Sequence, residues 1–158
     1  MEDTNVLRGT IAGEVFQENP DAWGYHLIID ARGCNDNIKS GDALTAWVQE
    51  LVELIDMVAY GKPMVEHFAK HDPLKAGYTL VQMIETSAIN GHFVDLNGGA
   101  YIDIFSCKPF NVHTVMEHFV EFFEPEDVFV GASYRGVFTD DAHGADVFTD
   151  DDEHGATA

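Results

Sequence analysis

Basic residues are scarce in this chain of 158 residues, where 8 Lys and Arg stand against 28 Asp and Glu and the formal net charge is −20. Nucleic-acid binding needs clustered Lys and Arg to neutralise phosphates, so this balance argues against a nucleic-acid partner. Cysteine is scarce too, and Cys34 and Cys107 alone do not build a disulfide framework. No apolar run approaches the about 20 residues that span a bilayer, and no signal peptide opens the chain. We therefore expect a reduced, cytoplasmic protein with no membrane association.

The residues that are present suffice for one folded domain. With 46% hydrophobic residues, a chain of this length buries about two-thirds of its unfolded surface. The two ends differ from the middle, because residues 1–21 are mixed and polar and residues 137–158 contain two near-copies of one segment, each of which begins Val-Phe-Thr-Asp-Asp. We expect an N-terminal extension over 1–21, a domain over 22–136 and an acidic, disordered tail over 137–158.

Hydrophobic periodicity predicts six strands and two helices in the domain. The first helix is expected to begin at the N-cap Ser40 and to run until Gly61 stops it. Asn111 is expected to cap the second helix, which Pro125 ends. Helices with one apolar face need a sheet to cover, so the fold class is α/β, a two-layer sandwich. The expected strands are 25–30, 65–68, 78–85, 89–94, 100–106 and 128–134, and the stripe of the first helix is Leu44, Trp47, Val48, Leu51, Leu54, Ile55 and Val58.

A hydroxyl, an imidazole and a thiol are spaced along the middle of the chain. Ser87 follows the expected strand 78–85, His92 comes five residues later, and Cys107 fifteen residues after that. Together with Gly24-Tyr-His-Leu and Ala100-Tyr-Ile-Asp-Ile-Phe-Ser-Cys, this spacing resembles the self-cleaving core of the prokaryotic S-adenosylmethionine decarboxylases. The resemblance covers most of the chain and implies that family's fold, a mainly antiparallel sheet backed by two helices.

The resemblance also implies that the chain makes its own cofactor by cutting itself between residues 86 and 87. Ser87 would attack the carbonyl of Thr86, and His92 would then remove the Ser87 α-proton, which leads to a pyruvoyl group at the new amino terminus. Serine suits this route because its side chain acts first as nucleophile and then as leaving group. Thr79 stands where the family places a hydroxyl that assists processing, and Cys107 where it places the proton donor in decarboxylation.

Other polar residues are weaker candidates for binding the substrate. His26 and Asp30 alternate on one face of the first strand. Glu66 and Glu85 are acidic candidates near the same motifs. A negative chain attracts a cationic amino-acid substrate, although a solvated acidic surface explains the charge as well. No metal site is expected, because the histidines are dispersed.

Three functions stay open on these residues. The first is decarboxylation of S-adenosylmethionine, which supplies aminopropyl groups for spermidine. The second is pyruvoyl-dependent decarboxylation of ornithine or arginine, because Thr86 and Ala88 flank Ser87 where the family usually reads Glu-Ser-His. The third is a catalytically inactive relative that regulates an active subunit.

A homodimer of processed protomers is the expected assembly. The resemblance implies pairing, and the apolar-rich segments 78–84 and 100–105 indicate that both sheet faces are partly buried. Two helices cover only one face, and a twofold dimer is the commonest way to cover the other.

Overall fold

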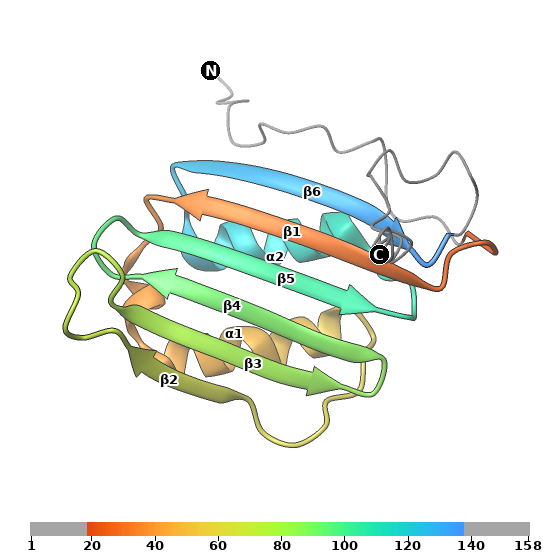
Figure 1. The fold of residues 1–158 in the computed structure, drawn as a ribbon, viewed down its shortest axis with the longest axis horizontal. Helices are drawn as coiled ribbons and strands as arrows, with labels where there is room; N and C mark the ends of the chain where they lie inside the picture. Colours follow the sequence, from red (N-terminus) through yellow and green to blue (C-terminus); the bar gives the residue numbers. More distant parts are fainter. Residues whose placement is uncertain (1–18, 138–158) are drawn as a thin grey trace, which may run out of the picture.

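The computed structural model describes residues 19–137, whose framework is a six-stranded antiparallel sheet (Figure 1). The sheet order is β2-β3-β4-β5-β1-β6, and every neighbouring pair is antiparallel. The predicted N-terminal extension and acidic tail lie almost entirely outside the described residues. The strands are β1 (Gly24–Arg32), β2 (Met64–Phe68), β3 (Gly77–Ile84), β4 (Ser87–Val94), β5 (Gly99–Ser106) and β6 (Asp127–Arg135).

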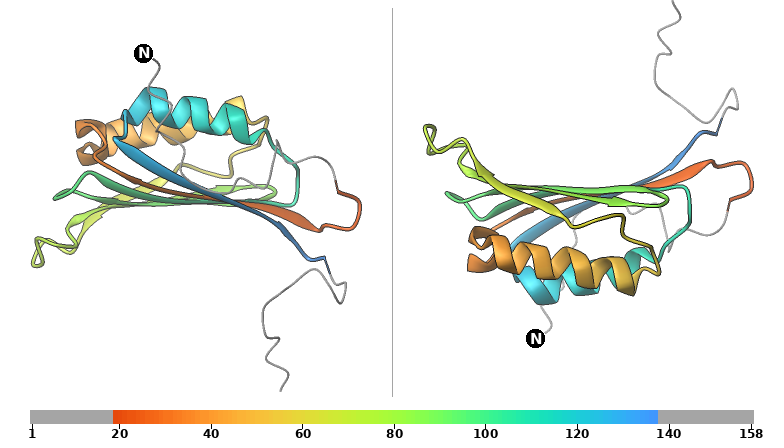
Figure 2. Two further views of the ribbon diagram at one scale, coloured as in Figure 1. Left: turned by 90° about the horizontal axis from the view of Figure 1, so that it is seen from above. Right: turned by 90° about the horizontal axis from the view of Figure 1, so that it is seen from below.

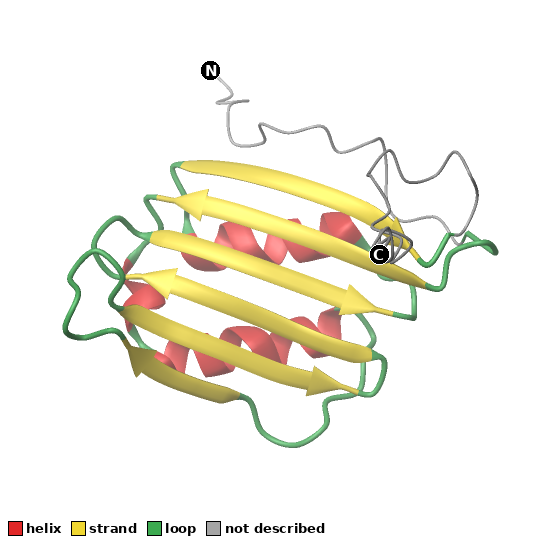
Figure 3. Ribbon diagram, in the orientation of Figure 1, coloured by secondary structure: helices red, strands yellow, loops and turns green. Residues whose placement is uncertain are grey.

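Two helices, α1 (Gly41–Leu54) and α2 (Val112–Phe123), cover one face of this sheet (Figure 3). A short 3-10 helix, η1 (Asp36–Lys39), precedes α1. Both predicted caps are present: the Ser40 side chain accepts from the Ala43 amide, and the Asn111 side chain accepts from the Thr114 amide, each at 3.2 Å. The two-layer α/β sandwich is therefore confirmed. Within residues 19–137, no helix is long and apolar enough to cross a membrane.

The hydrophobic core fills the space between the helices and the inner sheet face. Strand side chains alternate between faces, so every second residue of each strand points toward the helices. Of the α-helices in residues 19–137, both lie on the same side of the sheet (Figure 2); we call the other face the open face. Fully buried core side chains include Leu27, Ile29, Trp47, Leu51, Leu80, Ile89, Phe93, Ile102, Phe119 and Phe123.

The first helix is shorter than its periodicity predicts. It ends at Leu54, and Asp56 has a φ of 55°, a left-handed conformation that stops further helical turns. The chain then runs beside the end of β3, where the Tyr60 amide donates to the Met83 carbonyl at 2.8 Å. The extension of the apolar stripe through Leu54 and Val58 is wrong, because both side chains are more than half exposed.

The hairpin between β3 and β4 is tighter than expected. Its loop has only two residues, Glu85 and Thr86, and Ile84 pairs with Ser87 across it. Ser87 is therefore the first residue of β4 and not a residue of the turn. On its other side β4 pairs with β5, which places Ser106 opposite Ser87 at the predicted cleavage point.

Candidate active site

The backbone is strained at the predicted cleavage residue. Ser87 is half-buried and has a φ of 152°, in a region that residues with a side chain rarely adopt. Such conformations cost about 1–3 kcal/mol and persist where the surrounding structure holds them. Here the strand pairs on both sides, Ile84 with Ser87 and Ser87 with Ser106, supply that restraint.

The carbonyl of Thr86 accepts a hydrogen bond from the backbone amide of Cys107, with 3.0 Å between N and O. The sheet register produces this contact, because Ser106 lies opposite Ser87 in an antiparallel pair. Cys107, which follows Ser106, therefore lies beside Thr86, which precedes Ser87. A backbone amide aimed at a carbonyl oxygen can stabilise negative charge that develops there. The fold therefore brings together the backbones of Thr86, Ser87 and Cys107. The side chain of Cys107 is exposed.

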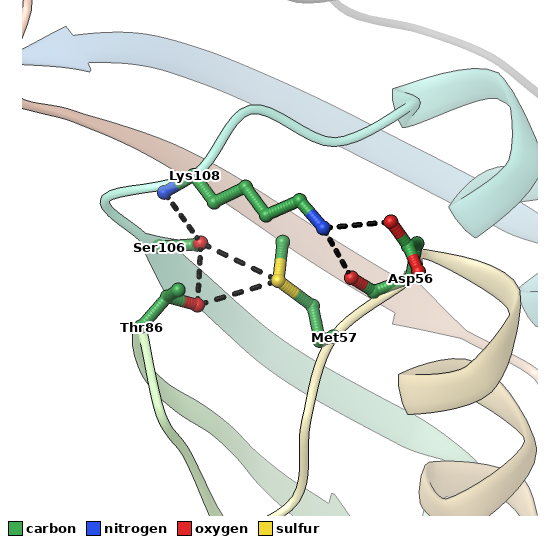
Figure 4. A network of polar contacts seen from close by, with 5 residues as sticks. All are labelled: Asp56, Met57, Thr86, Ser106 and Lys108. Carbon is green, nitrogen blue, oxygen red and sulfur yellow. Dashed lines mark hydrogen bonds and ion pairs between the residues drawn. The ribbon is translucent and has the colours of Figure 1, made fainter.

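The hydroxyl of Thr86 belongs to a partly buried polar network that the sequence does not reveal (Figure 4). Ser106 Oγ donates to Thr86 Oγ1 at 2.9 Å, and Thr86 Oγ1 donates to Met57 Sδ at 3.3 Å. Nothing in their spacing singles out Ser106 or Met57. Only the position of Ser106 beside Cys107 could have drawn attention to it.

The predicted processing residues His92 and Thr79 contact each other. Thr79 Oγ1 lies 3.0 Å from His92 Nδ1, because the two residues are paired across β3 and β4. His92 is five residues along β4 from Ser87, which places their backbones about 16 Å apart at the usual rise of a strand. Within one chain the structure therefore does not bring His92 to Ser87.

An ionic cluster lies on the open face near the Ser87 end of the sheet. His26 Nε2 contacts Asp103 Oδ1 at 2.9 Å, and Arg135 Nη1 lies 3.4 Å from His26 Nδ1. The Arg135 guanidinium also lies over the Phe105 ring, 5.1 Å from its centroid. Two strand spacings, about 10 Å, separate the Tyr25–His26 backbone from Ser87. Of the predicted substrate-binding residues on the open face, His26 is the one near Ser87, and its neighbour Arg135 is a residue that the sequence does not single out.

The acidic candidates are dispersed. Glu66 lies on the edge strand β2 opposite Thr79, which in turn pairs with His92. Glu66 is therefore level with His92 across the sheet and not with Ser87. Glu85 is exposed in the turn next to Thr86. Asp30 lines a shallow depression with Tyr101 and Phe129. Desolvation, followed by repulsion from the Asp103 carboxylate, raises the pKa of Asp30 above its ordinary value.

The two cysteines have different environments. Cys34 is partly buried, and burial raises the pKa of its thiol to about 11, so it stays protonated at neutral pH. Cys107 is exposed beside the hairpin turn. Of the two thiols, Cys107 is therefore the one in a position to act on a substrate.

Comparison with known proteins shows the family and the fold. The family model described as S-adenosylmethionine decarboxylase matches residues 25–136. The crystal structure of the adenosylmethionine decarboxylase from Aquifex aeolicus VF5 superposes with a TM-score of 0.64 at 18% sequence identity, covering 77% of this chain and 98% of that chain. At that identity the match establishes the fold alone. No match was found among curated protein sequences. The family match spans well over half of the chain, which therefore belongs to the S-adenosylmethionine decarboxylase family.

Proposed function

We propose that the chain is a pyruvoyl-dependent decarboxylase of S-adenosylmethionine, which generates its pyruvoyl group by cutting itself between Thr86 and Ser87. The observation that carries this proposal is the geometry of that peptide bond. Ser87 has a strained φ of 152°, and the Thr86 carbonyl is held by the Cys107 amide at 3.0 Å. Strain and a preorganised donor both favour attack on this carbonyl.

Self-cleavage would proceed in two stages. In the first, Ser87 Oγ attacks the Thr86 carbonyl carbon, the peptide C–N bond breaks, and the hydroxyl proton passes to the released amine, which leaves an ester. In the second, a base removes the Ser87 α-proton and the Cβ–Oγ bond breaks, so that Thr86 departs as a carboxylate. The remaining dehydroalanine tautomerises and takes up water, ammonia leaves, and residue 87 becomes a pyruvoyl group.

The pyruvoyl group would supply a ketone that binds the substrate amine and accepts the electrons released as carbon dioxide leaves. The exposed thiol of Cys107, one residue beyond the strand partner of Ser87, would return a proton to the substrate carbon. Asp103 and His26 would provide polar contacts for the cationic substrate on the open face. Family membership favours S-adenosylmethionine over ornithine or arginine as that substrate.

A second copy of the chain would complete the site. His92 is about 16 Å from Ser87 in its own chain, too far to remove the α-proton. Neither helix of residues 19–137 covers the open face (Figure 2), and this face carries half-exposed or largely exposed apolar side chains. Two protomers that meet through this face would bury them and could bring His92 and Thr79 of one to Ser87 of the other. The exposed apolar side chains at open-face positions are Met64, Phe68, Met83, Tyr101 and Phe129.

Mass and turnover measurements on the purified protein test the proposed reaction. The mature protein should give two chains, residues 1–86 and 87–158, and Ser87→Ala should remain a single chain. Carboxyl-labelled S-adenosylmethionine should release labelled carbon dioxide, whereas labelled ornithine and arginine should not. A wild-type chain that stays at full mass would rule out the pyruvoyl mechanism, and a cut chain without turnover on any of the three substrates would indicate a regulatory relative.

Co-expression of two inactive variants tests the composite site. If each site takes Ser87 from one chain and His92 from the other, a dimer of a Ser87→Ala chain and a His92→Ala chain contains one site with both defects and one site with neither. If His92 acts on the partner, the Ser87 of the His92→Ala chain is processed in this mixed dimer. If His92 acts within its own chain, neither chain is cut. Light scattering should also give the mass of a dimer, and a monomer that still processes would contradict the assembly.

A further inference from the structure

Five residues form one connected polar network around the hairpin turn (Figure 4). The Lys108 amide donates to Ser106 Oγ at 3.0 Å, Ser106 Oγ donates to Thr86 Oγ1 at 2.9 Å, and Thr86 Oγ1 donates to Met57 Sδ at 3.3 Å. Ser106 Oγ also lies 3.7 Å from Met57 Sδ, so the Thr86 hydroxyl, the Ser106 hydroxyl and the Met57 sulfur all contact one another. Ser106 is fully buried and Met57 is 8% exposed, which makes a lost partner costly.

An ion pair ties the far end of this network to α1. Lys108 Nζ contacts Asp56 Oδ2 at 2.7 Å and the Asp56 carbonyl oxygen at 2.6 Å. The C-terminal end of a helix carries partial negative charge, and the last turn of α1 contains no basic residue. Lys108 places its ammonium group beside this end, where it donates to the Asp56 carbonyl oxygen. Asp56 precedes Met57, and its hydrogen bond to Lys108 and the charge of that ammonium hold the pKa of its carboxyl below the ordinary value. The ion pair therefore restrains Asp56, and the next residue, Met57, accepts the hydrogen bond from the Thr86 hydroxyl.

The network spans the bond that self-cleavage would break. Asp56, Met57 and Thr86 precede that bond, whereas Ser106 and Lys108 follow it. Thr86 is thus held twice, at its hydroxyl by Ser106 and at its carbonyl oxygen by the Cys107 amide at 3.0 Å. Two anchors on one small residue determine how its carbonyl carbon is presented to the Ser87 hydroxyl.

We propose that Ser106 and Lys108 are positioning residues for self-cleavage, which hold the Thr86 carbonyl against the Cys107 amide through the Thr86 hydroxyl and through Asp56. This inference rests on the proposed self-cleavage and concerns its first stage. When Ser87 Oγ adds to the carbonyl carbon, negative charge develops on the carbonyl oxygen, where the Cys107 amide already points. The peptide nitrogen then leaves with the hydroxyl proton, and the ester forms without any group from outside the chain.

The rate at which freshly synthesised full-length precursor becomes two chains tests this role. Ser106→Ala should slow conversion about tenfold, the factor that one lost hydrogen bond of ordinary strength is worth, and Ser106→Thr should restore it. Lys108→Met should slow conversion by a smaller factor, about threefold, because an exposed ion pair contributes less. Lys108→Arg should restore the wild-type rate. Thr45→Val and Lys39→Met are matched controls, since they remove a half-buried hydroxyl bond and an exposed ion pair elsewhere in the structure.

Hydroxylamine separates positioning from general stability, because it cleaves the ester and leaves the amide intact. In a His92→Ala background, which should accumulate ester, adding Ser106→Ala should reduce the hydroxylamine-cleavable fraction, whereas adding Thr45→Val should not. Equal cleavable fractions with and without Ser106→Ala would overturn the positioning role. If wild type is cut and Ser106→Ala is cut within twofold of its rate, the positioning role alone fails. If the wild-type precursor is never cut, the proposed function fails with it.

Discussion

The backbone amide of Cys107 donates to the carbonyl oxygen of Thr86 at 3.0 Å, so the residue that offers the thiol also holds the bond that would be cut. The two groups of Cys107 are chemically independent. Its amide is present with any side chain except that of proline, whereas its thiol is not. Substitutions at this position can therefore separate the two reactions.

Cys107→Ala should process normally and lose decarboxylation. The amide that contacts Thr86 remains, whereas the proton donor is removed, and general acid catalysis of this kind contributes about 10²- to 10⁴-fold. Mass analysis should show two chains, and release of labelled carbon dioxide should fall by that factor. Full turnover in this variant would mean that another group protonates the substrate.

Ser87→Gly should be more stable than Ser87→Ala. Neither variant can be cut, but glycine adopts a φ of 152° without the steric cost that alanine pays there. Glycine also makes the unfolded chain more flexible, which offsets part of this advantage. The free energy of unfolding of Ser87→Gly should therefore exceed that of Ser87→Ala by about 1 kcal/mol. Urea denaturation of the two single-chain proteins measures it. Ala88→Gly, made in the uncuttable Ser87→Ala chain, is the control, because the loss of a strand side chain there should lower stability by about 0.5–1 kcal/mol.

Thr79→Val should slow the second stage of self-cleavage. The hydroxyl contacts His92 Nδ1 at 3.0 Å, and its removal frees the ring that would take the α-proton. We expect about tenfold slower conversion with accumulation of a hydroxylamine-sensitive ester, and near wild-type conversion for Thr79→Ser. An unchanged rate in Thr79→Val would show that His92 needs no orienting hydroxyl.

Alkylation at pH 8 should label the two cysteines very differently. With a pKa of about 11, Cys34 is about one part in a thousand thiolate at that pH, and its side chain is partly buried. Iodoacetamide should therefore modify the chain that contains Cys107 first, and Cys107→Ala should remove this fast phase. Labelling of Cys34 should rise about tenfold for each pH unit up to about 11. Equal labelling of both chains at pH 8 would contradict these environments.

Asp30→Asn should raise stability at neutral pH and lose this advantage in acid. Desolvation, with the Asp103 charge, raises the pKa of Asp30, so the folded chain holds this proton more tightly than the unfolded chain. The ordinary pKa of an Asp carboxyl is 3.8, and ionisation of Asp30 destabilises the fold as the pH rises from that value through the raised pKa. The loss of stability persists at pH 7. Because the side chain is exposed, the gain should be only a few tenths of a kcal/mol. Urea midpoints of both proteins at pH 3.5 and pH 7 measure the difference.

Local signals in the sequence predict most of the fold. Ser40 and Asn111 cap their helices as expected, because capping depends on a single side chain and the next three residues. The end of α1 is different. Apolar residues continue at helical spacing to Val58, but the left-handed Asp56 and the pairing of residues 58–60 with the end of β3 override this periodicity. Tertiary contacts decide that boundary, and no local pattern encodes them.

The candidate site is only partly predictable for a similar reason. Ser87 and Cys107 meet because their strands pair in one register, and the resemblance anticipates both residues. The separation of Ser87 from His92 also follows from sequence once both are placed on one strand. Met57 comes from the segment after α1, and Ser106 and Lys108 come from the end of β5 and the residues after it; no common motif links the two segments. Their network exists only because the shortened α1 leaves Asp56 and Met57 beside the hairpin turn.

The sheet order determines what becomes of the molecule once residues 86 and 87 are separated. One fragment would contain β1, β2, β3 and α1, and the other β4, β5, α2 and β6. Because β1 lies between β5 and β6, the fragments interlace, and the β3–β4, β5–β1 and β1–β6 pairs all become contacts between two polypeptides. Neither fragment could leave without dismantling the sheet, so the cut form should persist as long as it stays folded. Renaturation after denaturant would be a bimolecular reaction whose yield depends on protein concentration, whereas the uncut Ser87→Ala chain would refold independently of it.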